Sequence, residues 1–217
     1  MTPQQTKSSE NSEFEARKKA YHEAMQKAQS QVTAATAEVY KLRAEVKKQT
    51  AEARDKSIQK LHEATKELDA ARKQEQRAIE AHLKAIHADM VATDAELKHA
   101  TAAAKKAAEA RAKVIHEEYE AAKRSLIAVM DAELAEWKAR IDEASHLAAQ
   151  VKADVKSSVD AKISDVHAKQ EVAQKKLHAL KQANATAFNE VQHGLQAAIG
   201  EVKTALEHAR ADITKAL

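Results

Sequence analysis

The chain has 217 residues, with two glycines, one proline, no cysteine and only 3% aromatic residues. A compact globular core of this length normally uses tight turns and large side chains, and both are scarce here. Charged residues make up 32% of the chain but nearly balance, with a formal net charge of +3. This balance argues against a dedicated nucleic-acid binder, and the lack of cysteine excludes disulfides and thiol catalysis. An alanine-, lysine- and glutamate-rich composition is typical of long helices and coiled coils.

Residues 1–12 are polar and predict a disordered N-terminal tail. Ser12, followed three residues later by Glu15, fits the S-x-x-E capping box, so we expect the first helix to begin there. The tail has no apolar region typical of a signal peptide, and no run of 18 apolar residues follows it. The expectation is a soluble, cytoplasmic protein without a transmembrane segment.

Residues 13–193 predict one very long, nearly continuous amphipathic helix. Most of these residues are good helix formers, and no proline or glycine interrupts them. Apolar residues recur at alternating spacings of three and four in the blocks 21–46, 79–97 and 127–155. This spacing is the a/d pattern of a coiled coil.

The C-terminal segment, residues 194–217, continues an eleven-residue repeat. The spacing of bulky residues that begins at Phe188 recurs eleven residues later from Ile199. Eleven residues in three helical turns keep an apolar stripe on one face of a nearly straight helix. Gly194 and Gly200 each weaken a helix by about 1 kcal/mol relative to alanine, and they predict a flexible joint before this segment.

The fold predicted from these patterns is an all-α coiled-coil rod with mixed seven- and eleven-residue repeats. An unbroken helix of this length would extend roughly 300 Å. One helix cannot bury a narrow apolar stripe alone, so the prediction includes a partner: a second copy, another coiled-coil chain, or an apolar or lipid surface. The predicted helix–partner interface contains Met25, Val32, Val39, Val46, Ile79, Leu83, Ile86, Met90, Leu97, Ile127, Leu134, Trp137, Ile141, Val151, Phe188, Val191, Leu195, Ile199, Val202, Leu206 and Ile213.

The alternative is a chain that folds back on itself as an antiparallel helical hairpin or an elongated four-helix bundle. Without glycine or proline, a turn between helices would need asparagine, aspartate or serine. Weak candidates for such turns occur at residues 54–57, 99–113, 156–160 and 183–186. Breaks near residues 55, 108 and 158 would give four helices of similar length.

No motif in the sequence predicts a catalytic, cofactor or metal site. The chain has eleven histidines, but His82 and His87 are five residues apart, not the three or four of a helical metal-binding pair. We expect the histidines to be solvated, and their protonation in acid is a hypothesis for pH-dependent assembly. Neighbouring carboxylates such as Glu117 and Glu118 would lie on a solvated helix face without a pocket to shift their pKa values. The basic stretch 105–113 has no interleaved aromatic residues, so nucleic-acid binding is not expected.

The sequence leaves three functions open, all of them non-enzymatic. The first is a structural, scaffolding coiled coil that self-associates or pairs with another helical protein. In its eleven-residue amphipathic repeats the chain also resembles phasins and exchangeable apolipoproteins, which implies a coat on a lipid or storage-granule surface. Its stripe is narrower and poorer in tryptophan and phenylalanine than is usual for membrane-surface helices. Alanine- and lysine-rich repeats also resemble late-embryogenesis-abundant proteins, which implies a stress protectant. The many leucine, isoleucine and valine residues in register favour the first function.

Overall fold

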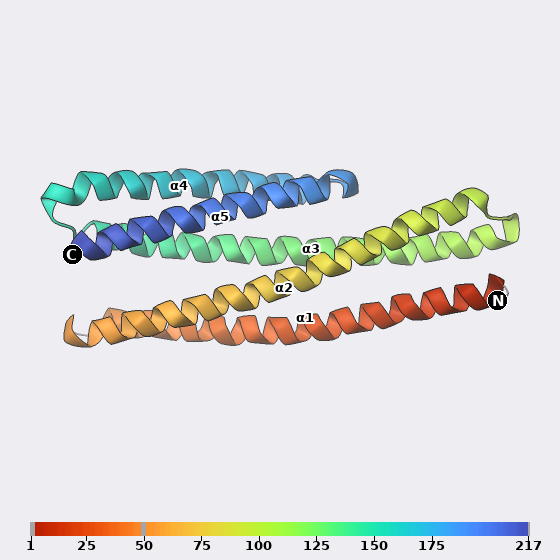
Figure 1. Cartoon of the computed structure of the whole chain (residues 1–217), viewed down its shortest axis with the longest axis horizontal. Helices are drawn as coiled ribbons and strands as arrows, with labels where there is room; N and C mark the ends of the chain where they lie inside the picture. Colours follow the sequence, from red (N-terminus) through yellow and green to blue (C-terminus); the bar gives the residue numbers. More distant parts are fainter. Residues whose placement is uncertain (1–2, 49–50, 217) are drawn as a thin grey trace. The chain divides into compact units, whose positions relative to one another are not determined.

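The computed structural model describes residues 3–48 and 51–216, and its regular structure is entirely α-helical. It contains the helices α1 (Pro3–Lys48), α2 (Ala51–His99), α3 (Ala102–Ala148), α4 (Ala153–Gln182) and α5 (Ala185–Ala216) (Figure 1). The chain divides into two compact units, Met1–Leu126 and Ile127–Leu217, so the boundary between the units lies within α3. The all-α prediction is confirmed, whereas the single continuous rod is not.

Helices α1 and α2 pack against each other in the first unit (Figure 1). Near one end of α1, Arg17 forms a bidentate ion pair with Asp89 of α2, with N–O distances of 2.9 and 2.8 Å. Near the other end, a buried cluster joins residues much closer in sequence. Because the pairs approach one another in reverse order along the two helices, α1 and α2 are antiparallel. The cluster consists of Val39, Leu42, Ala64 and Leu68, with Val32, Ala35 and Leu61 packed against it.

The first part of α3 is the third helix of this unit. Arg111 lies 3.7 Å from the carboxylate of Glu96 on α2, and Glu118 is 2.8 Å from the ammonium group of Lys18 on α1. Ile115, Tyr119 and other apolar residues on the same face of α3 are buried. The unit is therefore a three-helix arrangement where these segments meet.

The second unit contains the last part of α3 together with the paired helices α4 and α5. Lys162 of α4 forms an ion pair with Asp212 of α5. From α3, Asp131 contacts Lys181 of α4 at 2.9 Å, and Glu143 lies 3.9 Å from Arg210 of α5. The buried apolar faces of α4 and α5 are Val159, Ile163, Val166, Ala173, Leu177 and Leu180 on α4, and Phe188, Leu195, Ala198, Ile199, Val202, Leu206, Ala209 and Ile213 on α5.

The chain reverses between helices at positions that the sequence indicates only in part. The predicted turn at 183–186 is confirmed, because α4 ends at Gln182 and α5 begins at Ala185. The stretch 99–113 contains a turn only at its start, between His99 and Ala102, while 54–57 and 156–160 lie inside α2 and α4. Residues 49–50, between α1 and α2, lie outside the described residues.

The two turns that flank α3 differ in their residues. Thr101 directly precedes α3, and its backbone carbonyl accepts hydrogen bonds from the N–H groups of Ala104 and Lys105, each at 2.9 Å. The turn between Ala148 and Ala153 contains no threonine, but its Val151 is buried. Its backbone forms turn hydrogen bonds from the N–H groups of Gln150 and Val151 to the carbonyls of Leu147 and Ala148, at 3.0 and 3.4 Å. The predicted stripe does not continue smoothly across it, since Val155 is 36% exposed.

Helix α1 begins at Pro3, so Ser12 lies inside the helix and not at its N-cap. Proline is well tolerated in the first turn, where its missing N–H has no intrahelical partner to lose. Of the predicted tail, only residues 1–2 lie outside the part of the chain that the structure describes.

Both glycines lie within α5 and neither has a positive φ. A Cβ atom built at Gly200 would meet nothing within 4 Å, whereas one at Gly194 would lie 3.3 Å from the Lys176 ammonium nitrogen. Gly200→Ala should therefore raise the free energy of unfolding by about 0.5–1 kcal/mol, because alanine loses less backbone entropy in a helix. Gly194→Ala should raise the free energy of unfolding by less, since the Lys176 side chain must move to make room for the new methyl group. Urea denaturation of both variants measures the effect, and a loss of stability in Gly200→Ala would mean that α5 is interrupted there.

Asn184 caps the N-terminus of α5, where its Oδ1 accepts a hydrogen bond from the backbone N–H of Ala187 at 2.9 Å. Asn184→Ala leaves that N–H without its side-chain acceptor and should lower stability by about 1 kcal/mol. Asn184→Asp keeps a capping oxygen and serves as the matched control. Thermal unfolding of the two variants should separate them, and equal melting temperatures would contradict the capping role.

Candidate functional site

The residues predicted to meet a partner helix are all buried or partly buried within this chain, and none is classed as exposed. On α5, Phe188 and Leu195 are fully buried. The helices of the chain itself thus cover the apolar stripe that a partner was expected to cover. The members that remain partly exposed are Val32, Val46, Met90, Leu97, Ile127 and Val191.

The most concentrated group of polar side chains in the first unit lies where α1, α2 and α3 meet. Here we call it the His82 cluster, and it consists of Lys18, Tyr21 and His22 from α1, His82 from α2 and Glu118 from α3. The Nε2 atom of His82 lies 3.1 Å from Oε1 of Glu118. The ring of Tyr21 stacks on the His82 ring, with centroids 3.7 Å apart and planes inclined by 12°.

One carboxylate holds the cluster together. Lys18 Nζ approaches Oε2 of Glu118 at 2.8 Å, and His22 Nε2 lies 3.7 Å from Oε1. The side chains of His82 and Glu118 are only 5% and 8% exposed, whereas that of Lys18 is 30% exposed. A buried carboxylate is costly unless it is paired and hydrogen-bonded, and here helices α1 and α2 supply its partners.

The surroundings shift the pKa values of these groups. Burial lowers the pKa of His82, although the hydrogen bond with Glu118 acts in the opposite direction. Burial raises the pKa of Glu118, but the hydrogen bonds from Lys18 and His82 outweigh it, so its pKa lies below the usual value. The hydrogen bond to Glu118 raises the pKa of Lys18. At neutral pH the cluster therefore contains an ionised Glu118, a charged Lys18 and a neutral His82. Since a carboxylate only accepts hydrogen bonds, His82 donates from Nε2.

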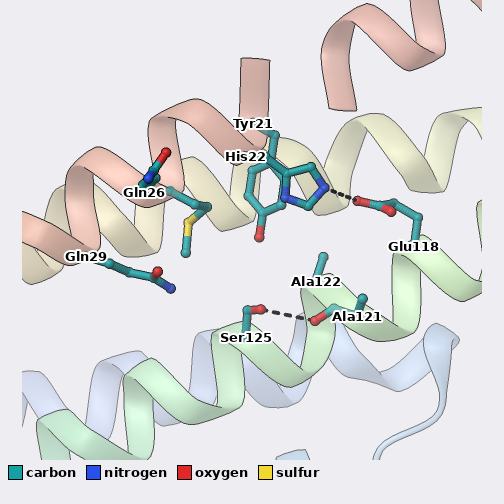
Figure 2. Close-up of a pocket in the computed structure, with 9 residues that line it drawn as sticks. Tyr21, His22, Gln26, Gln29, Glu118, Ala121, Ala122 and Ser125 are labelled. Carbon is teal, nitrogen blue, oxygen red and sulfur yellow. Dashed lines mark hydrogen bonds and ion pairs between the residues drawn. The ribbon is translucent and has the colours of Figure 1, made fainter. Parts of the chain in front are cut away.

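A pocket of about 200 Å³ lies beside the cluster, between α1 and α3. Figure 2 shows Tyr21 and His22 pointing toward it from α1, with Glu118 and Ser125 on the opposite helix. The Ser125 hydroxyl donates to the carbonyl of Ala121 at 3.2 Å. The full lining is Tyr21, His22, Met25, Gln26, Gln29, Glu118, Ala121, Ala122 and Ser125.

The His82 cluster joins three helices through side-chain contacts. An imidazole beside a carboxylate can act as a general base when a substrate reaches it. The His82 ring, however, is buried and one of its faces is covered by Tyr21. Within the described residues, no group of three or more histidine, aspartate or glutamate side chains has an arrangement that could hold a metal ion.

Sequence reasoning missed this cluster because it treated Glu118 and the histidines as solvated. That expectation is wrong for Glu118 and His82, which are both buried. A signal was present, since His82 lies three residues after Ile79 and four before Ile86, on the buried face of α2. Its partners come from other helices, and spacing within α2 carries no information about them.

A buried ion pair lies on α3 in the second unit, between two residues four apart in sequence. Arg140 Nε lies 3.1 Å from Glu136 Oε1, and the Arg140 guanidinium lies 4.3 Å from the centroid of the Trp137 ring. The arginine thus combines an ion pair with a cation–π contact. Trp137, which the sequence places on the apolar stripe, is itself buried.

Comparisons with protein-family models, with curated proteins and with solved structures found no match to this chain. Among the helices that the structure describes, none is long and apolar enough to cross a membrane.

Proposed function

We propose that this chain is a non-enzymatic structural protein, a helical scaffold that folds first and then associates through its outer surface. The observation that carries the proposal is the burial of the apolar stripe by the chain's own helices, including Leu68 in the first unit and Leu206 in the second. A protein whose stripe is already covered needs no lipid or partner in order to fold. Its partner would be a second copy or another helical protein that meets the mixed-charge outer faces.

Polar contacts between helices support the same proposal. The Arg17–Asp89 ion pair and the His82 cluster join side chains that are far apart in sequence. Contacts of this kind fix which residues face one another, whereas an alanine-rich apolar stripe defines register weakly because its layers are alike. A scaffold needs a defined register, so these contacts favour the role.

The scaffold proposal is tested by examining the purified chain alone in dilute buffer. Circular dichroism should show high helicity and a cooperative thermal transition. Size-exclusion chromatography with light scattering over a range of concentrations then measures whether copies associate. A chain that is unfolded in buffer, and becomes helical only with lipid or on drying, would contradict the proposal.

The second candidate is a coat on a lipid or granule surface, and the hairpin of α4 and α5 favours it. Only Ala183 and Asn184 separate these two helices. Helix α4 covers the apolar face of α5, and α5 covers that of α4. If the hairpin opened, Phe188 and the other apolar residues of α5 would be exposed to a surface.

The two candidates differ in the distance across this hairpin. Cysteine replacements at the exposed positions Ser164 and Glu207 can be labelled selectively, because the chain has no cysteine of its own. If the chain is a scaffold, the distance between the two labels should stay short when vesicles of anionic phospholipid are added. If it coats a surface, the vesicles should increase that distance toward about 65 Å, the length of one helix containing both positions.

A further inference from the structure

Three helices of the first unit meet at a single buried carboxylate. Helix α1 contributes Lys18, Tyr21 and His22, α2 contributes His82, and α3 contributes Glu118. The Tyr21 ring covers the His82 ring on the α1 side, and Glu118 receives the hydrogen bond of His82 on the α3 side. A change of charge on His82 therefore alters the contacts of α2 with both α1 and α3.

The charges of Lys18 and Glu118 balance only while His82 is neutral. Glu118 and Lys18 then form one negative and one positive charge at 2.8 Å. If His82 is protonated, two cations, Lys18 and His82, contact one carboxylate. Repulsion between like charges is stronger in a buried site than in water, because the surroundings screen it less.

Further acidic groups lie around the cluster on each helix. Glu15 of α1 and Glu117 of α3 are near Lys18 and help to raise its pKa, and Glu75 of α2 interacts with Tyr21. Burial raises the pKa of Glu75, so protonation of Glu75 favours the folded state and opposes an acid-induced loss of stability. That same protonation removes one of the negative charges that would otherwise offset the positive charge of a protonated His82.

We propose that the His82 cluster is an acid-sensitive contact, which holds α1 against α2 and α3 at neutral pH and releases α1 when His82 becomes protonated.

The direction of the effect follows from proton linkage. The pKa of His82 is lowered in the folded chain from its ordinary value of 6.5. The unfolded state therefore binds a proton more readily, and the contribution of His82 to stability is complete above pH 6.5 and is lost as the pH falls below it. The pKa of Glu118 is also lowered, from 4.5, so its contribution is lost at still lower pH. Loss of the contact should begin at about pH 6.5, the ordinary pKa of histidine.

Hydrogen exchange at about pH 7.5 and 5.5 tests the proposal, with rates corrected for the intrinsic pH dependence of exchange and pH values chosen to bracket the ordinary histidine pKa. In the unmodified chain, amides of α1 around residues 14–30 should lose protection in acid relative to amides of α4. The loss should reach at most about tenfold, because pH 5.5 lies about one unit below the ordinary histidine pKa. His82→Gln retains a donor for Glu118 but cannot be protonated, and it should abolish the loss. His87→Gln, at an exposed position on the same helix, is the matched control and should behave like the unmodified chain.

Two results would overturn the proposal: no relative loss of protection in the unmodified chain, or an equal loss in His82→Gln. Circular dichroism at neutral pH shows whether His82→Gln is folded. If it is not, His82→Phe keeps an aromatic ring against Tyr21 without a titrating group, and its exchange is interpreted in the same way.

Discussion

Replacing Leu68 by alanine is expected to lower the free energy of unfolding by about 2–5 kcal/mol. Leu68 is fully buried in the cluster that joins α1 to α2, so truncation removes apolar contacts and leaves a cavity between the two helices. Urea denaturation followed by far-ultraviolet circular dichroism measures the loss.

The matched control is Ile58→Ala on the same helix, where the isoleucine is 46% exposed. An exposed substitution of this kind should change stability by no more than about 0.5 kcal/mol. Equal losses of unfolding free energy in Leu68→Ala and Ile58→Ala would contradict the packing of α2 against α1. In a helix alone in solution both positions would be exposed, and the two substitutions would have similar effects.

In the second unit the largest effect is expected from Phe188→Ala, at about 3–5 kcal/mol. Phe188 is fully buried on the apolar face of α5, and it lies one turn after the Asn184 cap. Trp137 is the only tryptophan in the chain and belongs to this unit. Its fluorescence therefore reports the unfolding of the unit in which the substitution is made.

Val172→Ala is the control for Phe188→Ala, since Val172 is 47% exposed on α4. It should leave the urea midpoint of the Trp137 signal almost unchanged. A Phe188→Ala variant with an unchanged midpoint would contradict the burial of Phe188 in a core that also supports Trp137.

The sequence predicts the helical class and part of the buried faces of the helices, although no predicted residue lies on the buried face of α4. Periodic spacing identifies residues such as Ile79, Leu83 and Ile86, because every third or fourth residue returns to the same side of a helix. The same spacing holds whether the covering helix belongs to another chain or to the same one. Periodicity alone could therefore not distinguish a rod from hairpins.

What the sequence could not supply is the position of most turns and the composition of the His82 cluster. The segment around Val151 contains no glycine, proline or asparagine, so its residue types do not indicate the turn that its backbone forms. Glu118 is buried because Lys18 and His82, which lie 100 and 36 residues away in sequence, approach it in space. Contacts over such separations become visible only once the order and direction of the helices are known. Asn184, by contrast, combines turn and capping chemistry in one residue, and its turn was predicted.

The chain folds back into antiparallel hairpins, and a single distance within the first unit tests this arrangement most directly. Lys19 and Ala88 are exposed residues beside the Arg17–Asp89 ion pair, and cysteines at both positions can carry spin or fluorescent labels. With α1 against α2, the labels should lie about 20–30 Å apart, which corresponds to two or three helix diameters. A distance of about 100 Å, the length of one unbroken helix between these positions, would contradict the hairpin and support a continuous helical rod.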